Sequence, residues 1–197
     1  MRRYVLTGAP GAGKTTLADA LRRRGWDVVA EAATDVIAAQ QGRGVAEPWR
    51  EAGFVDAVVR LQRERREAPG AYGPVQVHDR SPLCTLALAR HLGRPPGRVL
   101  AEEVRRVLRD GAYQRQVFLV EPLGFVTPSA ARRIGYVESL AFARVHEEVY
   151  RAHGHDLIAV PPAPVRARVA LVEAHLRRLA DLPSEGVEGV PDPAYLT

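Results

Sequence analysis

Near its amino terminus the chain carries a group of residues whose types and spacing suit the binding of phosphate. Residues 8–15 read Gly-Ala-Pro-Gly-Ala-Gly-Lys-Thr and match the pattern G-x-x-x-x-G-K-[ST] in full. Glycines let a backbone turn so tightly that successive N–H groups point at phosphate oxygens. Lys14 is expected to contact the β- and γ-phosphates, and the Thr15 hydroxyl to bind Mg²⁺. The pattern predicts a nucleotide site formed by Gly8, Ala9, Pro10, Gly11, Ala12, Gly13, Lys14, Thr15 and Thr16.

Lys14 is also the only lysine of the chain, in which all other Lys or Arg positions are arginine. A lysine ammonium is a compact point charge, which suits a site crowded with phosphates. The chain lacks the Asn-Lys-x-Asp sequence typical of guanine recognition, and this absence favours ATP. We therefore expect ATP to be the phosphate donor, together with Mg²⁺.

Two carboxylates follow apolar segments that are typical of buried strands. Glu31 comes after residues 26–30, and Asp79 ends the segment 75–79. Because open α/β sheets bind ligands at the carboxyl ends of their strands, both are expected at the site. Asp79, with Thr15, is expected to order Mg²⁺ and its waters. Glu31 is a candidate to take a proton from an acceptor hydroxyl, to hold substrate hydroxyls, or to cap the next helix. Asp35, one turn further on, is a weaker candidate for substrate binding.

A pair of arginines, Arg132 and Arg133, ends a loop over residues 121–133 that is interrupted by Pro and Gly. Negative charge spreads over the phosphoryl oxygens during transfer, and a mobile arginine can neutralise it while the loop excludes water. Two arginines at a helix start oppose the local helix dipole, and this small penalty favours a functional role. We expect a lid in which one of them is catalytic.

The residues named so far need a framework of alternating strands and helices. Apolar segments at 3–7, 26–30, 75–79, 116–120 and 156–160 predict five strands, with helical patterns between them. Ser81 is the expected N-cap of a helix that has Pro82 at its first position. A later helix is expected to bury a stripe of Val137, Ala141, Val145 and Val149. The alternation predicts an α/β fold whose five-stranded, mostly parallel sheet has helices on both faces.

Composition limits the functions open to the chain. A length of 197 residues suits one domain, expected over residues 1–182, with an acidic, Gly- and Pro-rich tail over 183–197 that is expected to be flexible. The net charge of +5 comes from arginines that are dispersed along the chain, and the chain has few aromatic residues. Both features make nucleic acid an unlikely partner. With the single cysteine Cys84 and no apolar run near ~20 residues, we expect a cytoplasmic protein without a membrane span.

Three of these stretches together resemble a known family. They are Gly-Ala-Pro-Gly-Ala-Gly-Lys-Thr-Thr-Leu from residue 8, Val-Val-Ala-Glu-Ala-Ala-Thr-Asp-Val-Ile from residue 28, and His-Asp-Arg-Ser-Pro from residue 78. They are similar to small P-loop ATPases of the AAA type with a kinase-like fold, a family that includes nicotinamide-riboside kinase domains. The order of the acidic and basic residues also resembles that of deoxynucleoside kinases. The resemblance covers nearly the whole chain.

The resemblance implies a P-loop NTPase fold with a kinase-like lid, and a role for each matching residue. Glu31 would be the base or a substrate holder, Asp79 the acid beside Mg²⁺, and Arg80 an anion contact in the substrate site. Arg132 or Arg133 would be the lid arginine. Related proteins often carry an aspartate shortly before that arginine, whereas this chain has Pro-Ser-Ala-Ala at 128–131.

Two functions from different classes agree with this resemblance. The first is an ATP- and Mg²⁺-dependent kinase of a nucleoside-like or other hydroxylated metabolite, or an ATPase built on the same fold. The second is a regulatory switch whose bound nucleotide gates a protein or lipid partner. The oligomeric state does not follow from the sequence.

Overall fold

The structure of the chain is a computed structural model, which describes residues 1–68, 73–123 and 135–181. The expected lid arginines, Arg132 and Arg133, and the expected tail over 183–197 lie outside the described residues.

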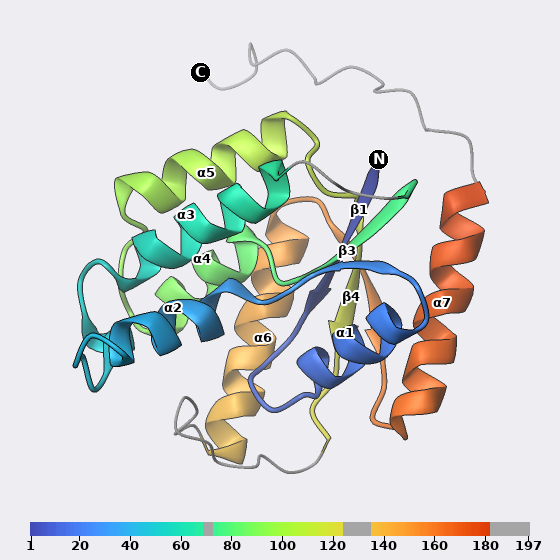
Figure 1. Ribbon diagram of the computed structural model, residues 1–197, viewed down its shortest axis with the longest axis horizontal. Coiled ribbons are helices and arrows are strands. Elements are labelled where there is room, and N and C mark those ends of the chain that lie inside the picture. The colour runs from blue at the N-terminus through green and yellow to red at the C-terminus, as the bar shows by residue number, and fades with distance from the viewer. Residues whose placement is uncertain (69–72, 124–134, 182–197) are drawn as a thin grey trace.

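The centre of the molecule is a single five-stranded sheet (Figure 1). Its strands are β1 (Arg2–Thr7), β2 (Asp27–Val29), β3 (Val75–Asp79), β4 (Gln116–Val120) and β5 (Asp156–Val160). They lie in the order β2-β3-β1-β4-β5, and every pair is parallel. The predicted α/β fold is confirmed, and the sheet is parallel throughout. Because the chain moves from β1 to one side and later to the other, the end of β1 is the point where open sheets bind ligands.

Helix α4 (Pro82–His91) begins at the position that the sequence predicts. Ser81 caps α4, because its Oγ accepts a hydrogen bond from the Leu83 N–H at 3.2 Å. The α-helices are α1 (Lys14–Arg23), α2 (Ala32–Gln41), α3 (Phe54–Glu67), α4 (Pro82–His91), α5 (Arg98–Arg109), α6 (Tyr136–Ala152) and α7 (Val165–Asp181), with a 3₁₀ turn at Pro48–Arg50. None of the described helices is long and apolar enough to span a membrane.

The helices cover both faces of the sheet, as predicted. Helices α1 and α7 pack on one face, where Leu17, Val172 and Leu176 meet buried residues of β1, β3, β4 and β5 (Figure 1). Helices α4, α5 and α6 pack on the other face, and α3 joins them through Val59. Helix α2 packs on α3 through a smaller apolar cluster that includes Phe54. This cluster stands beside the carboxyl end of β2, close to Glu31.

Helix α6 buries a different face from the one predicted. Val137 is 81% exposed and Ala141 is exposed, so the predicted stripe is wrong over the first half of the helix. The side chains that point inward there are Ser139, Phe142 and His146. The stripe was misplaced because two of these three residues are polar. The partners of those polar residues lie in the candidate site.

Candidate functional site

The phosphate-binding loop joins β1 to α1 and has the backbone shape that its glycines allow. Gly8, Gly11 and Gly13 have φ values of 126°, 82° and 81°, a region that other residues rarely adopt. Gly8 also has a steric role, because a Cβ there would lie 2.4 Å from the Val120 carbonyl oxygen at the end of β4. The loop therefore packs against the neighbouring strand in a way that a side chain at residue 8 would prevent.

Lys14 is buried at the start of α1, with its ammonium inside the loop. Its Nζ donates to the Ala9 carbonyl oxygen at 2.6 Å. Burial and the nearby Arg80 guanidinium lower the pKa of Lys14 to about 7, against the opposing effect of the Asp79 and Glu31 carboxylates. A bound triphosphate would bring further negative charge to this ammonium and favour its protonated form.

Asp79 lies beside Thr15, as the sequence predicts. The Thr15 hydroxyl donates to Asp79 Oδ2 at 3.2 Å. The other carboxylate oxygen, Oδ1, is buried and has no hydrogen-bond partner among the described residues. Burial and the charge of Glu31 raise the pKa of Asp79 above its ordinary value. A hydroxyl next to a buried carboxylate with one unused oxygen fits Mg²⁺, which takes oxygen ligands and often only one or two from the protein.

Glu31 and Arg80 form a buried ion pair between the phosphate-binding loop and α2. Arg80 Nε donates to Glu31 Oε1, and Thr34 Oγ1 donates to Glu31 Oε2 at 2.8 Å. Burial raises the pKa of Glu31, but Arg80, Lys14 and the Thr34 hydrogen bond outweigh it and lower the pKa to about 2. Glu31 occupies the N-cap position of α2, yet its side chain makes no capping hydrogen bond. Of the three roles that the sequence left open, helix capping is therefore not observed.

Arg80 has an unusual backbone conformation. Its φ of 81° makes it the one non-glycine residue with a positive φ in the described part of the chain. Its N–H donates to the Leu6 carbonyl oxygen at 3.1 Å, and its Nη1 to the Gly8 carbonyl oxygen at 3.2 Å. Such a conformation costs of order 1–3 kcal/mol and is found where the surroundings fix it, often at functional sites.

A cavity of about 310 Å³ adjoins this ion pair. Glu31 and Arg80 line it and also line the smaller hollow over Lys14 and Thr15. Gln62 lies in its wall with both ends of its amide engaged, because Nε2 donates to Ser81 O and Oε1 accepts from Thr85 Oγ1. The remaining wall is largely apolar and includes Ile37, Trp49, Phe54, Val58, Leu88 and Phe142. The cavity thus has a charged end next to the phosphate-binding loop, formed by Glu31 and Arg80, and its lining also includes the side chains of Glu138 and His91.

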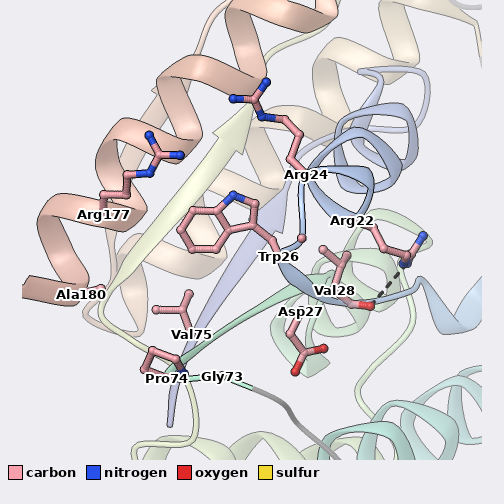
Figure 2. Close-up of a pocket in the computed structure, with 11 residues that line it drawn as sticks. Arg22, Arg24, Trp26, Asp27, Val28, Gly73, Pro74, Val75, Arg177 and Ala180 are labelled. Atoms are coloured by element: carbon pink, nitrogen blue, oxygen red, sulfur yellow. Dashed lines mark hydrogen bonds between the residues drawn. The ribbon is translucent and has the colours of Figure 1, made fainter.

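A larger groove, of about 830 Å³, lies at the opposite end of the strands. Figure 2 shows Trp26 in this groove, with Arg24 and Arg177 on one side of its indole and Val75 on the other. The groove lies beside the amino ends of β2 and β3 and contains none of the predicted site residues. Because ligands of open parallel sheets bind at the carboxyl ends of the strands, the smaller cavity is the candidate site.

Two further residues that hold the phosphate-binding loop were not found from the sequence. Ser139 Oγ on α6 donates to the Pro10 carbonyl oxygen at 3.0 Å. Arg168 on α7 is 3% exposed, and its Nη1 donates to the Ala12 carbonyl oxygen at 2.8 Å. Both are polar residues on inward helix faces. A polar residue on the inward face of a helix is the only sequence feature that could have indicated their role.

Not every predicted residue lies at this site. Asp35 is paired with Arg65 and does not line the cavity, so its role in substrate binding stays a prediction that the geometry does not support. Two aromatic residues, Trp49 and Phe54, line the cavity. Arg132 and Arg133 lie outside the described residues.

Comparison with solved structures supports the kinase-like fold. Deoxyadenosine kinase from M. mycoides with bound dATP matches with a TM-score of 0.58 at 14% identity, over 90% of this chain and 100% of that chain. NadR in complex with NR matches with a TM-score of 0.60 at 14% identity, over 95% of this chain and 54% of that chain. At this level of identity the likeness shows the fold alone.

No curated protein matches the chain in sequence. The sequence model of one family does match, over residues 3–168, and that family is described as AAA domain. The match runs from β1 to Arg168 and therefore includes the phosphate-binding loop, Glu31, Asp79 and Arg80. The resemblance expected from the sequence is confirmed: the chain belongs to the AAA domain family and has the fold of P-loop kinases.

Proposed function

We propose that the chain is an ATP- and Mg²⁺-dependent phosphotransferase of the cytoplasm that acts on a small hydroxylated, nucleoside-like acceptor. One observation carries this proposal: the Glu31–Arg80 pair borders both the phosphate-binding hollow and the 310 Å³ cavity. An acceptor in the cavity would present its hydroxyl to the terminal phosphate at this pair. Holding both reactants in line is the main contribution that a protein makes to phosphoryl transfer.

The donor side of the reaction is assigned to the loop and to Asp79. Backbone N–H groups and Lys14 would hold the phosphates of ATP, while Thr15 and Asp79 would hold Mg²⁺. The ion supplies positive charge that neutralises the phosphate oxygens as the bond to the leaving group breaks. Arg80, whose guanidinium is already fixed, would stabilise charge on the transferred phosphoryl group. We keep Arg132 and Arg133 as the proposed lid arginines.

For Glu31 we propose that it holds the acceptor hydroxyl. With its pKa lowered to about 2 by Arg80 and Lys14, the carboxylate stays ionised and accepts hydrogen bonds well. The same low pKa makes it a weak base. Phosphoryl transfer passes through a loose transition state, so positioning of the hydroxyl contributes more than its early deprotonation.

The class of acceptor follows from the cavity and from the related kinases. Apolar and aromatic walls suit a flat ring, and the charged end suits a hydroxyl group. The similar structures are those of a deoxyadenosine kinase with bound dATP and of NadR with NR. A nucleoside-like molecule combines a ring with a hydroxylated sugar and therefore matches both features.

Glu31→Gln tests the proposal, because it removes the charge but keeps the shape of the side chain. ATP consumption is measured for both proteins with and without each member of a nucleoside panel, beside the affinity for a non-hydrolysable ATP analogue. We expect at least one nucleoside to stimulate the wild type, and the affinity for the analogue to stay close to that of the wild type in the mutant. The stimulated rate should fall about 10- to 100-fold in Glu31→Gln, the range for a lost hydrogen bond to a charged group. If no acceptor stimulates the wild type and the mutant behaves identically, the chain is a nucleotide switch and not a kinase.

A further inference from the structure

His146 is a buried histidine of α6 whose side chain contacts Arg80 of the candidate site. It is 0% exposed, and its Nδ1 lies 2.9 Å from the Phe142 carbonyl oxygen. A carbonyl oxygen only accepts, so Nδ1 carries the proton and donates. Nε2 is then an unprotonated acceptor, and it faces Arg80 Nη1 at 3.3 Å. The two hydrogen bonds fix one tautomer of a neutral imidazole.

The neutral form of His146 is favoured by its surroundings. Burial and the charge of Arg80 lower its pKa well below the ordinary value, despite the bond to Phe142 O. If His146 were protonated, Nε2 would carry an N–H that faces the N–H of Arg80, and Arg80 would lose this acceptor. His146 therefore offers Arg80 a neutral acceptor from one side, while Glu31 offers a charged one from another.

The neighbours of His146 on α6 also face the site. Ser139 bonds the Pro10 carbonyl of the phosphate-binding loop, and Phe142 lines the 310 Å³ cavity. Phe142 also packs on the His146 ring, with ring centroids 4.4 Å apart. Positions 139, 142 and 146 are three and four residues apart, so they share one face of the helix. This face touches the loop, the cavity wall and Arg80.

We propose that His146 is a positioning residue, which holds the Arg80 guanidinium between the phosphate-binding hollow and the acceptor cavity. Arg80 has a left-handed backbone, and its long side chain needs fixed acceptors to keep one orientation. Glu31 and Gly8 O supply two, and His146 Nε2 supplies the third, from α6. The role of Arg80 in transfer rests on the proposed function, whereas its placement by His146 does not.

The test compares His146→Leu, which removes the acceptor, with His146→Gln, which keeps one on a side chain of similar reach. His175→Leu is the matched control, because His175 makes the same bond to a carbonyl four residues back, at 2.9 Å, and an edge contact with Phe118. Crystal structures of the three variants show the position of Arg80, and melting curves show whether each variant is folded. If His146→Leu does not fold, His146→Asn replaces it, since its amide is too short to reach Arg80.

In His146→Leu we expect the Arg80 side chain to move away from Glu31 or to adopt more than one position. In His146→Gln and His175→Leu we expect it to stay where it is in the wild type. With Mg²⁺-ATP as probe, the rate of ATP consumption should fall about 10- to 100-fold in His146→Leu, because this is the range for a lost hydrogen bond to a charged group. The affinity for ATP should change little. His146→Gln should recover most of the rate.

An unchanged Arg80 in the crystal structure of His146→Leu would overturn the proposal. So would a loss of rate that His146→Gln shares in full, or one that follows only the loss of folded protein. If the wild type consumes no ATP, the proposed function fails, and the position of Arg80 in the variants still decides the role of His146.

Discussion

At the scale of single residues, Lys14 has a strongly shifted pKa. The pKa of its ammonium is lowered to about 7, chiefly because the group is buried and secondly because it lies near the Arg80 guanidinium. A bound triphosphate brings several negative charges next to the ammonium and therefore restores its proton. ATP binding and protonation of Lys14 are thus linked.

This linkage predicts that ATP binding takes up protons above neutral pH. At pH 8 the free protein holds Lys14 mostly neutral, and the complex holds it charged, so uptake should approach about one proton per ATP. Below pH 7 the ammonium is already charged in the free protein, and uptake by this group disappears. Calorimetric titration in buffers of different ionisation enthalpy measures the number directly. Binding heats at pH 8 that do not depend on the buffer would contradict the assignment.

Asp79 carries a second prediction at the residue scale. Its Oδ2 is bonded by Thr15, and its Oδ1 is free to approach an ion or an ordered water. Asp79→Asn should lower turnover by orders of magnitude in Mg²⁺, yet leave metal-free ATP binding nearly intact. The measurement is turnover against Mg²⁺ concentration, with Asp156→Asn, an exposed residue at the far edge of the sheet, as control. A normal Mg²⁺ dependence in the mutant would show that Asp79 has only a structural role.

At the scale of elements, helices α3 and α5 are joined by a buried ion pair. Arg66 Nη1 donates to Glu103 Oε1 at 2.7 Å, and the two side chains are 7% and 4% exposed. Arg106 of α5 also reaches Glu103, at 3.1 Å. Helix α3 carries Phe54, Val58 and Gln62, which line the 310 Å³ cavity, so this pair supports one wall of the cavity.

Removing one partner should destabilise the fold, because the other charge remains buried. Glu103→Ala is expected to lower the free energy of unfolding by about 3–5 kcal/mol. Glu102→Ala is the control, because its pair with Arg98 is exposed and should contribute at most about 1 kcal/mol. Urea denaturation of both variants gives the comparison. Equal losses would show that the buried pair is no more important than the exposed one.

Helix α6 shows where sequence patterns stop being informative about elements. Its extent was predictable from its periodicity and from the His-Gly stop, and the structure ends it at Ala152. Its inward face was not predictable, because Ser139 and His146 are polar and their acceptors and donors lie far away in the chain. A helix that buries polar groups against a site breaks the apolar pattern on that side, and such local failures are typical of functional sites.

At the scale of the whole molecule, the sequence was sufficient for the fold and for the position of the phosphate-binding loop between β1 and α1. A complete phosphate-binding motif between a strand and a helix, together with regular alternation, leaves few alternatives for a single chain of this size. The proposed acceptor side depends on contacts between α2, α3, α4 and α6. Those contacts determine that Glu31 meets Arg80 while Asp35 meets Arg65, and these pairings do not follow from a local pattern in the sequence.

The central claim is that this molecule transfers phosphate from ATP to a small hydroxylated acceptor. The most direct test incubates the protein with Mg²⁺-ATP and a pool of metabolites rich in nucleosides, and reads the products by mass. We expect one compound or one class to gain the mass of a phosphoryl group with the wild type, and none with Lys14→Ala, which lacks the ammonium that holds the phosphates. If the wild type binds ATP but no compound gains a phosphoryl group, the claim is contradicted.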